Sequence, residues 1–243
     1  MDGFVASTGD LAEAAALVVP TSAAALRGSF QSPTTELNHL LDLEALVFTK
    51  QRSGFDPAAI AAAKEAVDVA DGPGGLKFLV FDFNHVDAAG DEPAPGAGEL
   101  MADLSNLILR APVVTVAAAR GPMRGVDLEL ALSCNVMVGE EAATFSFDAD
   151  PLLSVRTYAL LAQKIGFVRA ERLMENGDVL DAEAMRTLLL LKEKLAPPGG
   201  LEGLTGFLRR FTRRHNAAYG IYRAQRIASP FPLDRLQSPA AQV

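Results

Sequence analysis

The chain has 243 residues, of which 49% are hydrophobic and 21% charged, and this suits one globular domain with a sizeable buried core. Its 30 acidic residues outnumber its 22 basic ones, and the formal charge of −8 argues against a nucleic-acid-binding surface. No apolar run approaches the roughly 20 residues that a membrane-spanning helix needs. The single cysteine excludes an internal disulfide, and Leu11 to Val19 is a poor signal peptide, so we expect a cytoplasmic protein.

The N-terminal third mixes small polar residues with two candidate elements. Residues 1–33 are rich in Ala, Ser, Thr and Gly, which predicts a mobile tail or a loose helix from Asp10 to Val18. Leu43 to Phe48 is a candidate early strand. Asp56 followed by Pro57 is typical of a helix start, and a helix is predicted over Ala58 to Ala70.

The middle of the chain predicts a right-handed crossover unit. Lys77 to Phe83 is a strand, a loop runs from Asn84 to Pro93, and a helix follows from Gly98 to Arg110. Pro112 to Ala119 is a short apolar run rich in β-branched residues, which predicts a strand buried on both faces.

A tight turn and a short helix come directly after that strand. Arg120-Gly121-Pro122 is a turn signal, and Gly125 allows a second sharp change of direction. The helix that follows carries Asp127 and Glu129 in its predicted first turn, where the helix dipole favours carboxylates. Free backbone N–H groups at such a helix start can hold an oxyanion, and a carboxylate one turn on can move a proton beside it. Two further strands are predicted, over 135–138 and 144–147.

The stretch from Pro112 to Asn135 resembles the crotonase (enoyl-CoA hydratase/isomerase) superfamily, whose pattern is roughly P-V-I-A-A-V-N-G-x-A-x-G-G-G-x-E-L-A-x-x-C-D. The chain keeps the proline, the apolar strand and the motif positions Gly121, Gly125, Glu129-Leu130-Ala131 and Cys134. It departs from the pattern at Arg120, Val126, Asp127 and Asn135. The resemblance implies an α/β fold, a crotonase-like spiral of ββα units with a helical C-terminal trimerisation region.

The resemblance also implies a set of site residues. The backbone N–H groups of Ala89, in Ala89-Gly90-Asp91, and of Val126 would form the oxyanion hole, with Glu129 as acid or base. The second family carboxylate falls at Ala149, which cannot transfer protons. Asp148 and Asp150 flank it and are candidates for that role. The plainer alternatives are an ordinary loop at Ala89, a dipole-favoured Glu129 and a turn-forming pair of solvated aspartates.

Helical patterns fill the rest of the chain, over 151–166, 168–176, 182–191 and 201–227. Asn176-Gly177-Asp178 is a predicted C-cap and turn, and Asp181 can N-cap the next helix. We expect a core over 34–196 and a helical region over 197–243. An apolar stripe in that region, Leu204, Phe207, Leu208 and Phe211, predicts burial against a neighbouring subunit in a homotrimer or hexamer.

Two segments narrow the resemblance to crotonase-like synthases of diffusible fatty-acid signals: Leu130 to Cys134 with Glu140-Glu141, and the tail from Arg213 to Leu236. A basic cluster, Arg209, Arg210, Arg213, Arg214 and His215, is either a solvated helix face or a contact for coenzyme A phosphates.

The function implied is an enzyme of hydratase, isomerase or thioesterase type that acts on acyl-CoA or acyl-carrier-protein thioesters, with the coenzyme A thioester as substrate and no cofactor. The three scattered histidines predict no metal site, and Cys134 is interpreted as a core residue. The alternative is a catalytically degenerate homologue that acts as a partner or scaffold subunit, which the lost glycines and Ala149 favour.

Overall fold

The structure is a computed structural model that describes residues 30–31, 35–50, 61, 63–64, 67, 76–84, 97–147, 154–196, 200–212 and 219–222. The tail predicted over 1–33 lies outside these residues, apart from Phe30–Gln31, which form strand β1. Within the helix predicted over 58–70, the described residues 61, 63, 64 and 67 are helical.

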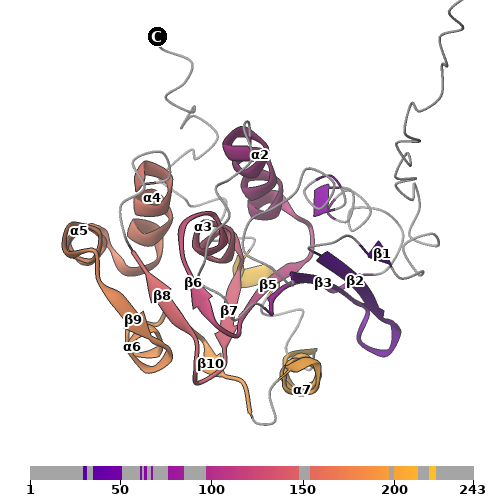
Figure 1. Cartoon of the computed structure of the whole chain (residues 1–243). Helices are drawn as coiled ribbons and strands as arrows, with labels where there is room; N and C mark the ends of the chain where they lie inside the picture. Colours follow the sequence, from indigo (N-terminus) through magenta and orange to yellow (C-terminus); the bar gives the residue numbers. More distant parts are fainter. Residues whose placement is uncertain are drawn as a thin grey trace, which may run out of the picture.

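A seven-stranded sheet forms the centre of the molecule, with the strand order β1-β2-β3-β4-β5-β7-β10 (Figure 1). The strands from β3 to β10 are parallel to their neighbours, whereas β1, β2 and β3 pair antiparallel. The bounds after β1 are β2 Thr35–Leu40, β3 Ala45–Lys50, β4 Phe78–Phe83, β5 Val114–Ala119, β7 Val136–Gly139 and β10 Glu193–Lys194, with a short 3-10 helix, η2, at Leu41–Leu43.

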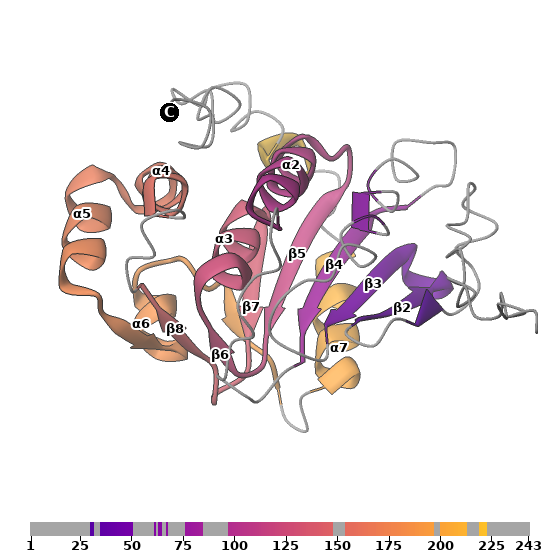
Figure 2. The ribbon, with the colours of Figure 1, turned by 45° about the horizontal axis from the view of Figure 1, so that its top comes forward.

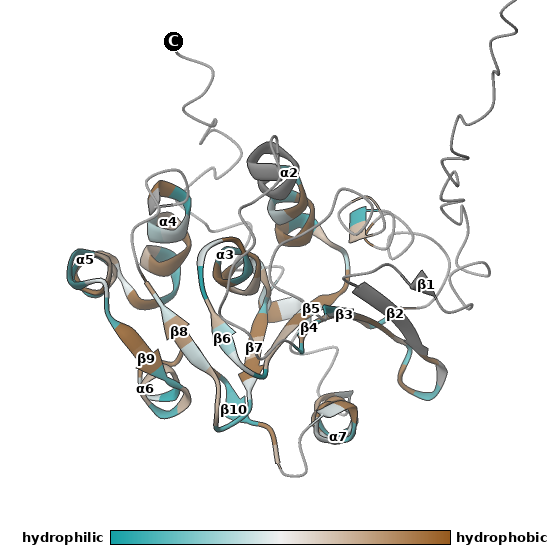
Figure 3. Cartoon of the chain, viewed as in Figure 1, coloured by the Kyte–Doolittle hydropathy of each residue, from teal (hydrophilic) through white to brown (hydrophobic). Residues whose placement is uncertain are grey.

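The central strands are buried on both faces, as predicted for the run that forms β5. Alternate side chains enter two separate cores. In β4, Leu79 and Phe81 belong to the first core and Phe78 and Val80 to the second. Hydrophobic residues colour β5 and β7 brown along most of their length (Figure 3).

Helices cover both faces of the sheet (Figures 1 and 2). The first core takes side chains from α2 Ala97–Arg110, α3 Gly125–Ser133, α4 Ser154–Ile165 and α5 Phe167–Asn176, whereas α7 Gly200–Thr212 covers the second core. A small second sheet, in the order β6-β8-β9, consists of β6 Pro122–Met123, β8 Thr144–Ser146 and β9 Val179–Asp181, and α6 Ala182–Thr187 follows it. No helix in the described ranges is long and apolar enough to cross a membrane.

The predicted caps of the C-terminal helices are confirmed. Gly177 ends α5 in the left-handed conformation, with φ 62°, and the Asp181 carboxylate accepts a hydrogen bond of 2.7 Å from the Ala184 N–H at the start of α6.

The helix predicted over 182–191 ends earlier than expected, at Thr187. Leu189 takes a positive φ of 61°, and the N–H groups of Leu190 and Leu191 both donate to the Met185 carbonyl. This turn buries Leu190 and Leu191, so tertiary packing stops a helix that sequence periodicity continues.

The apolar stripe on α7 is real, but the prediction that a neighbouring subunit buries it is wrong. Leu204, Phe207, Leu208 and Phe211 are all buried in the second core of the same chain. The ring of Phe211 lies 6.0 Å from that of Phe78 on β4 and 5.4 Å from that of Phe207. The chain's own sheet therefore covers the stripe, and the trimer or hexamer stays a prediction that needs another surface.

Candidate active site

The site is organised around the start of α3, directly after the buried strand β5. The chain turns at Gly121 and enters α3 at Gly125, whose φ of 51° favours glycine. The N–H groups of Gly125 and Val126 come before the first backbone hydrogen bonds of the helix, which Asp127 and Leu128 donate to the Arg124 carbonyl. They carry the positive end of the helix dipole. This is the donor arrangement that an oxyanion hole requires.

Glu129 lies one turn beyond Val126 and is only 2% exposed. Because α3 begins at Gly125, Glu129 falls in the second turn rather than in the first as predicted. Its Oε1 atom lies 2.8 Å from Nε of Arg156 on α4 and accepts a hydrogen bond of 3.4 Å from Ser105 on α2. The other oxygen, Oε2, is buried and has no hydrogen-bond partner.

Burial raises the pKa of the Glu129 carboxyl above its ordinary value, and Arg156 and Ser105 oppose the shift without cancelling it. A buried carboxyl with a raised pKa and one oxygen without a hydrogen-bond partner is compatible with proton transfer and also with a structural ion pair.

A second buried ion pair joins α3 to the sheet. Lys50, the last residue of β3, pairs with Asp127, and these two residues are 2% and 5% exposed. The ammonium lies 6.0 Å from the centre of the Phe83 ring. Burial lowers the pKa of Lys50, and the Asp127 charge opposes that shift. Because Asp127 directly follows Val126, Lys50 balances a carboxylate that would otherwise repel an anion at the helix start.

A third pair lies on the face of the sheet that α7 covers. Arg120 donates from Nε to Asp82 Oδ1 over 2.7 Å and from Nη2 to Oδ2 over 2.5 Å. Burial raises the pKa of Asp82, and Arg120 opposes the rise. Glu140, which lies 3.9 Å from Arg120, accepts a hydrogen bond from the Gly200 N–H at the start of α7. Arg120, a departure from the family pattern, therefore links β4 and β5 to this helix.

The structure brings Val126 and Glu129 together on α3. The other predicted site residues, Ala89, Asp148 and Asp150, lie outside the described residues, as does Ala149. Sequence reasoning missed the buried partners Lys50, Ser105 and Arg156 and the half-buried Asn106. The sequence signal for the contacts that α2 makes is the polar pair Ser105-Asn106, which interrupts the otherwise apolar end of the helix predicted over Gly98 to Arg110.

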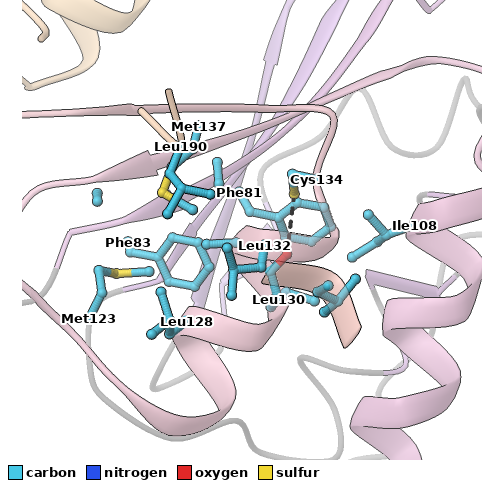
Figure 4. Close-up of a cluster of buried hydrophobic side chains, with 14 of the residues drawn as sticks. Phe81, Phe83, Ile108, Met123, Leu128, Leu130, Leu132, Cys134, Met137 and Leu190 are labelled. Carbon is cyan, nitrogen blue, oxygen red and sulfur yellow. Dashed lines mark hydrogen bonds between the residues drawn. The ribbon is translucent and has the colours of Figure 1, made fainter. Parts of the chain in front are cut away.

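The remaining motif residues have structural contacts. Cys134 is buried in the first core, and its thiol donates to the Leu130 carbonyl over 3.5 Å (Figure 4). Asn135, another departure from the pattern, accepts from both the backbone N–H and the hydroxyl of Thr115, at 2.9 and 3.0 Å. It thereby joins the turn before β7 to β5.

The exposed basic residues on α7 are paired. Arg209 contacts Asp42, and Arg210 contacts Glu193; Arg213, Arg214 and His215 lie outside the described residues. Among the residues that the structure describes, no three His, Cys, Asp or Glu side chains gather in a way that would hold a metal ion.

No family model and no curated protein matches the chain. Solved structures match it over most of its length, and they show that it has the crotonase fold. One is an enoyl-CoA hydratase from Mycobacterium avium subsp. paratuberculosis K-10, 19% identical, with a TM-score of 0.69 over 84% of this chain and 89% of that one. A putative enoyl-CoA hydratase/isomerase (crotonase) from Legionella pneumophila is 17% identical, with a TM-score of 0.65 over 84% and 86% of the two chains. A methylmalonyl-CoA decarboxylase complexed with 2S-carboxypropyl-CoA is 11% identical, with a TM-score of 0.65 over 83% and 84%.

Proposed function

We propose that the chain is an acyl-thioester enzyme of the enoyl-CoA hydratase/isomerase type, acting on acyl-CoA or acyl-carrier-protein thioesters. The observation that carries the proposal is the position of Glu129. It is a buried carboxyl with a raised pKa, one helical turn beyond the N–H donors at the start of α3, in a crotonase fold.

The proposed chemistry follows from this arrangement. The thioester carbonyl oxygen would accept from the Val126 N–H, with the Ala89 N–H as the second donor, and these donors would stabilise the enolate or tetrahedral oxyanion. Glu129 would take a proton from the acyl chain or its attacking water, or return one. Asp148 or Asp150 would supply a second carboxylate, and the reaction needs no cofactor beyond the coenzyme A of the substrate.

The names of the matching solved structures support this class of substrate. They include enoyl-CoA hydratases, an enoyl-CoA hydratase/isomerase and a decarboxylase bound to a coenzyme A ester. We propose a hydratase or isomerase first and a thioesterase second. The most specific version of the proposal is a synthase of diffusible fatty-acid signals, and it rests on the sequence resemblance alone.

A second candidate function is a catalytically degenerate scaffold subunit. The observation that favours it is the same carboxyl, because Glu129 is 2% exposed and forms an ion pair with Arg156. A buried ion pair of this kind is compatible with a purely structural role.

Turnover of a panel of enoyl- and acyl-CoA esters separates the two functions. We expect the wild-type chain to turn over at least one ester and Glu129→Gln to lose roughly 10²- to 10⁴-fold in rate while still binding that ester. Glu171→Gln, which changes an exposed carboxylate on α5, is the matched control and should keep full activity. If the wild-type chain neither binds nor turns over any ester, the scaffold function is correct.

A further inference from the structure

Arg156 on α4 forms an ion pair with Glu129 through Oε1, and the other oxygen, Oε2, has no hydrogen-bond partner. We propose that Arg156 is the positioning residue of Glu129: it fixes Oε1 at the junction of α2, α3 and α4, so that Oε2 is the oxygen that exchanges a proton with the substrate. This inference rests on the proposed function and adds a residue to it.

The contacts at the two oxygens are unequal. Oε1 accepts a hydrogen bond from Ser105 Oγ over 3.4 Å and lies 2.8 Å from Arg156 Nε in an ion pair, although Nε itself has no hydrogen-bond partner. Oε2 is buried with no hydrogen-bond partner. A buried polar atom without a partner is costly and needs an explanation. A role of Oε2 in proton transfer to or from the substrate would explain why this oxygen has no hydrogen-bond partner within the chain.

The chain contains a matched comparison in the Asp82–Arg120 pair. There the guanidinium donates to both carboxylate oxygens, through Nε and Nη2, as a stabilising ion pair does. The Glu129–Arg156 pair lacks this bidentate geometry, because Nη2 of Arg156 donates to Asn106 Oδ1 over 2.9 Å and not to Glu129. The guanidinium is thus held by Asn106 on α2 and offers Glu129 a single contact.

The charges around the carboxyl match a positioning role. Arg156 is the cation that faces it from α4, and α2 presents the neutral Ser105 and Asn106 together with Asp103, whose charge acts on Arg156. On α3 itself, Asp127 is paired with Lys50. Arg156 therefore opposes the upward shift that burial gives the pKa of Glu129, and its removal should raise that pKa further.

The test is the pH dependence of turnover in Arg156→Gln and Arg156→Lys. We expect Arg156→Gln to lower kcat by on the order of 10²-fold with little change in KM, because Glu129 loses its fixed orientation. The acid limb of kcat/KM should move to higher pH by about one unit or more. Arg156→Lys, which keeps the charge, should leave the acid limb near its wild-type position and recover part of kcat.

Arg120→Lys is the control, because it disturbs a buried ion pair on the other face of the sheet. It should lower stability to urea without moving the acid limb. If the Arg156 variants lose stability but keep the wild-type kcat and acid limb, Arg156 is only structural and the inference is overturned. An active Glu129→Gln variant, or a wild-type chain without turnover, would instead refute the proposed function on which the inference depends.

Discussion

At the scale of single residues, three ion pairs with buried carboxylates join the elements of the fold: Glu129–Arg156, Asp127–Lys50 and Asp82–Arg120. The sequence motif identified Glu129 as a candidate site residue, because Glu129 lies only four positions after Gly125 in the same motif. The motif did not predict the cationic partners of Glu129 and Asp127. Lys50 lies 77 positions before Asp127 in the sequence, and no periodicity links residues so far apart.

Removing Arg120 is expected to destabilise the fold. Arg120→Ala leaves the carboxylate of Asp82, 1% exposed, without its buried cation, and this should cost about 3–5 kcal/mol in the free energy of unfolding. Urea denaturation measures the loss. Arg209→Ala is the control, since Arg209 and Asp42 are both more than half exposed and such pairs contribute about 0–1 kcal/mol.

The loss in the free energy of unfolding that Arg120→Ala causes should also depend on pH. Without Arg120, the pKa of Asp82 in the folded chain rises further above the value of about 3.9 that an unfolded aspartate has. The folded state then binds the proton more tightly than the unfolded state does. The deficit is therefore largest at pH values above the folded pKa and shrinks as the pH falls toward about 4. A deficit independent of pH would contradict the role given to Asp82.

At the scale of elements, most of the long periodic patterns were predicted well, and several of the shortest strands were missed. The strands β4 and β5 and the helices α2, α3 and α5 lie close to their predicted ranges. Strands β6, β9 and β10 have two or three residues each, too few to show a period. For α7, the prediction of an apolar stripe was correct, whereas the prediction that a neighbouring subunit covers it was wrong. A sequence shows which face of a helix is apolar but not which surface covers that face.

Truncating the α7 stripe tests that correction. Phe207→Ala removes a side chain that is 2% exposed in the second core and should cost about 3–5 kcal/mol in the free energy of unfolding. Leu201→Ala, at a position 39% exposed on the same helix, should cost clearly less. Urea denaturation at several protein concentrations makes the measurement. If the cost at Phe207 disappears at low concentration, the stripe is covered by another subunit instead.

For the whole molecule, the crotonase fold persists at 11–19% identity to the solved structures that match it. The fold needs strands buried on both faces and a buried α3, and the motif from Pro112 to Cys134 conveys both, which is why sequence alone predicted it. Activity needs the loops around the site, and the predicted residues Ala89, Asp148 and Asp150 fall in segments with no periodic pattern. The fold was therefore predictable, whereas only the α3 half of the candidate site was.

The central claim is that a thioester oxygen binds the N–H groups at the start of α3, beside Glu129. Amide NMR spectra of the Glu129→Gln chain, which should not consume the ester, titrated with a short acyl-CoA, test it most directly. We predict that the Val126 amide proton moves downfield as the ester saturates, since it gains a hydrogen bond. The Gly177 amide, already bonded to the Leu173 carbonyl at the end of α5, should stay in place. Saturable binding that leaves Val126 unshifted, or no binding at all, would contradict the claim.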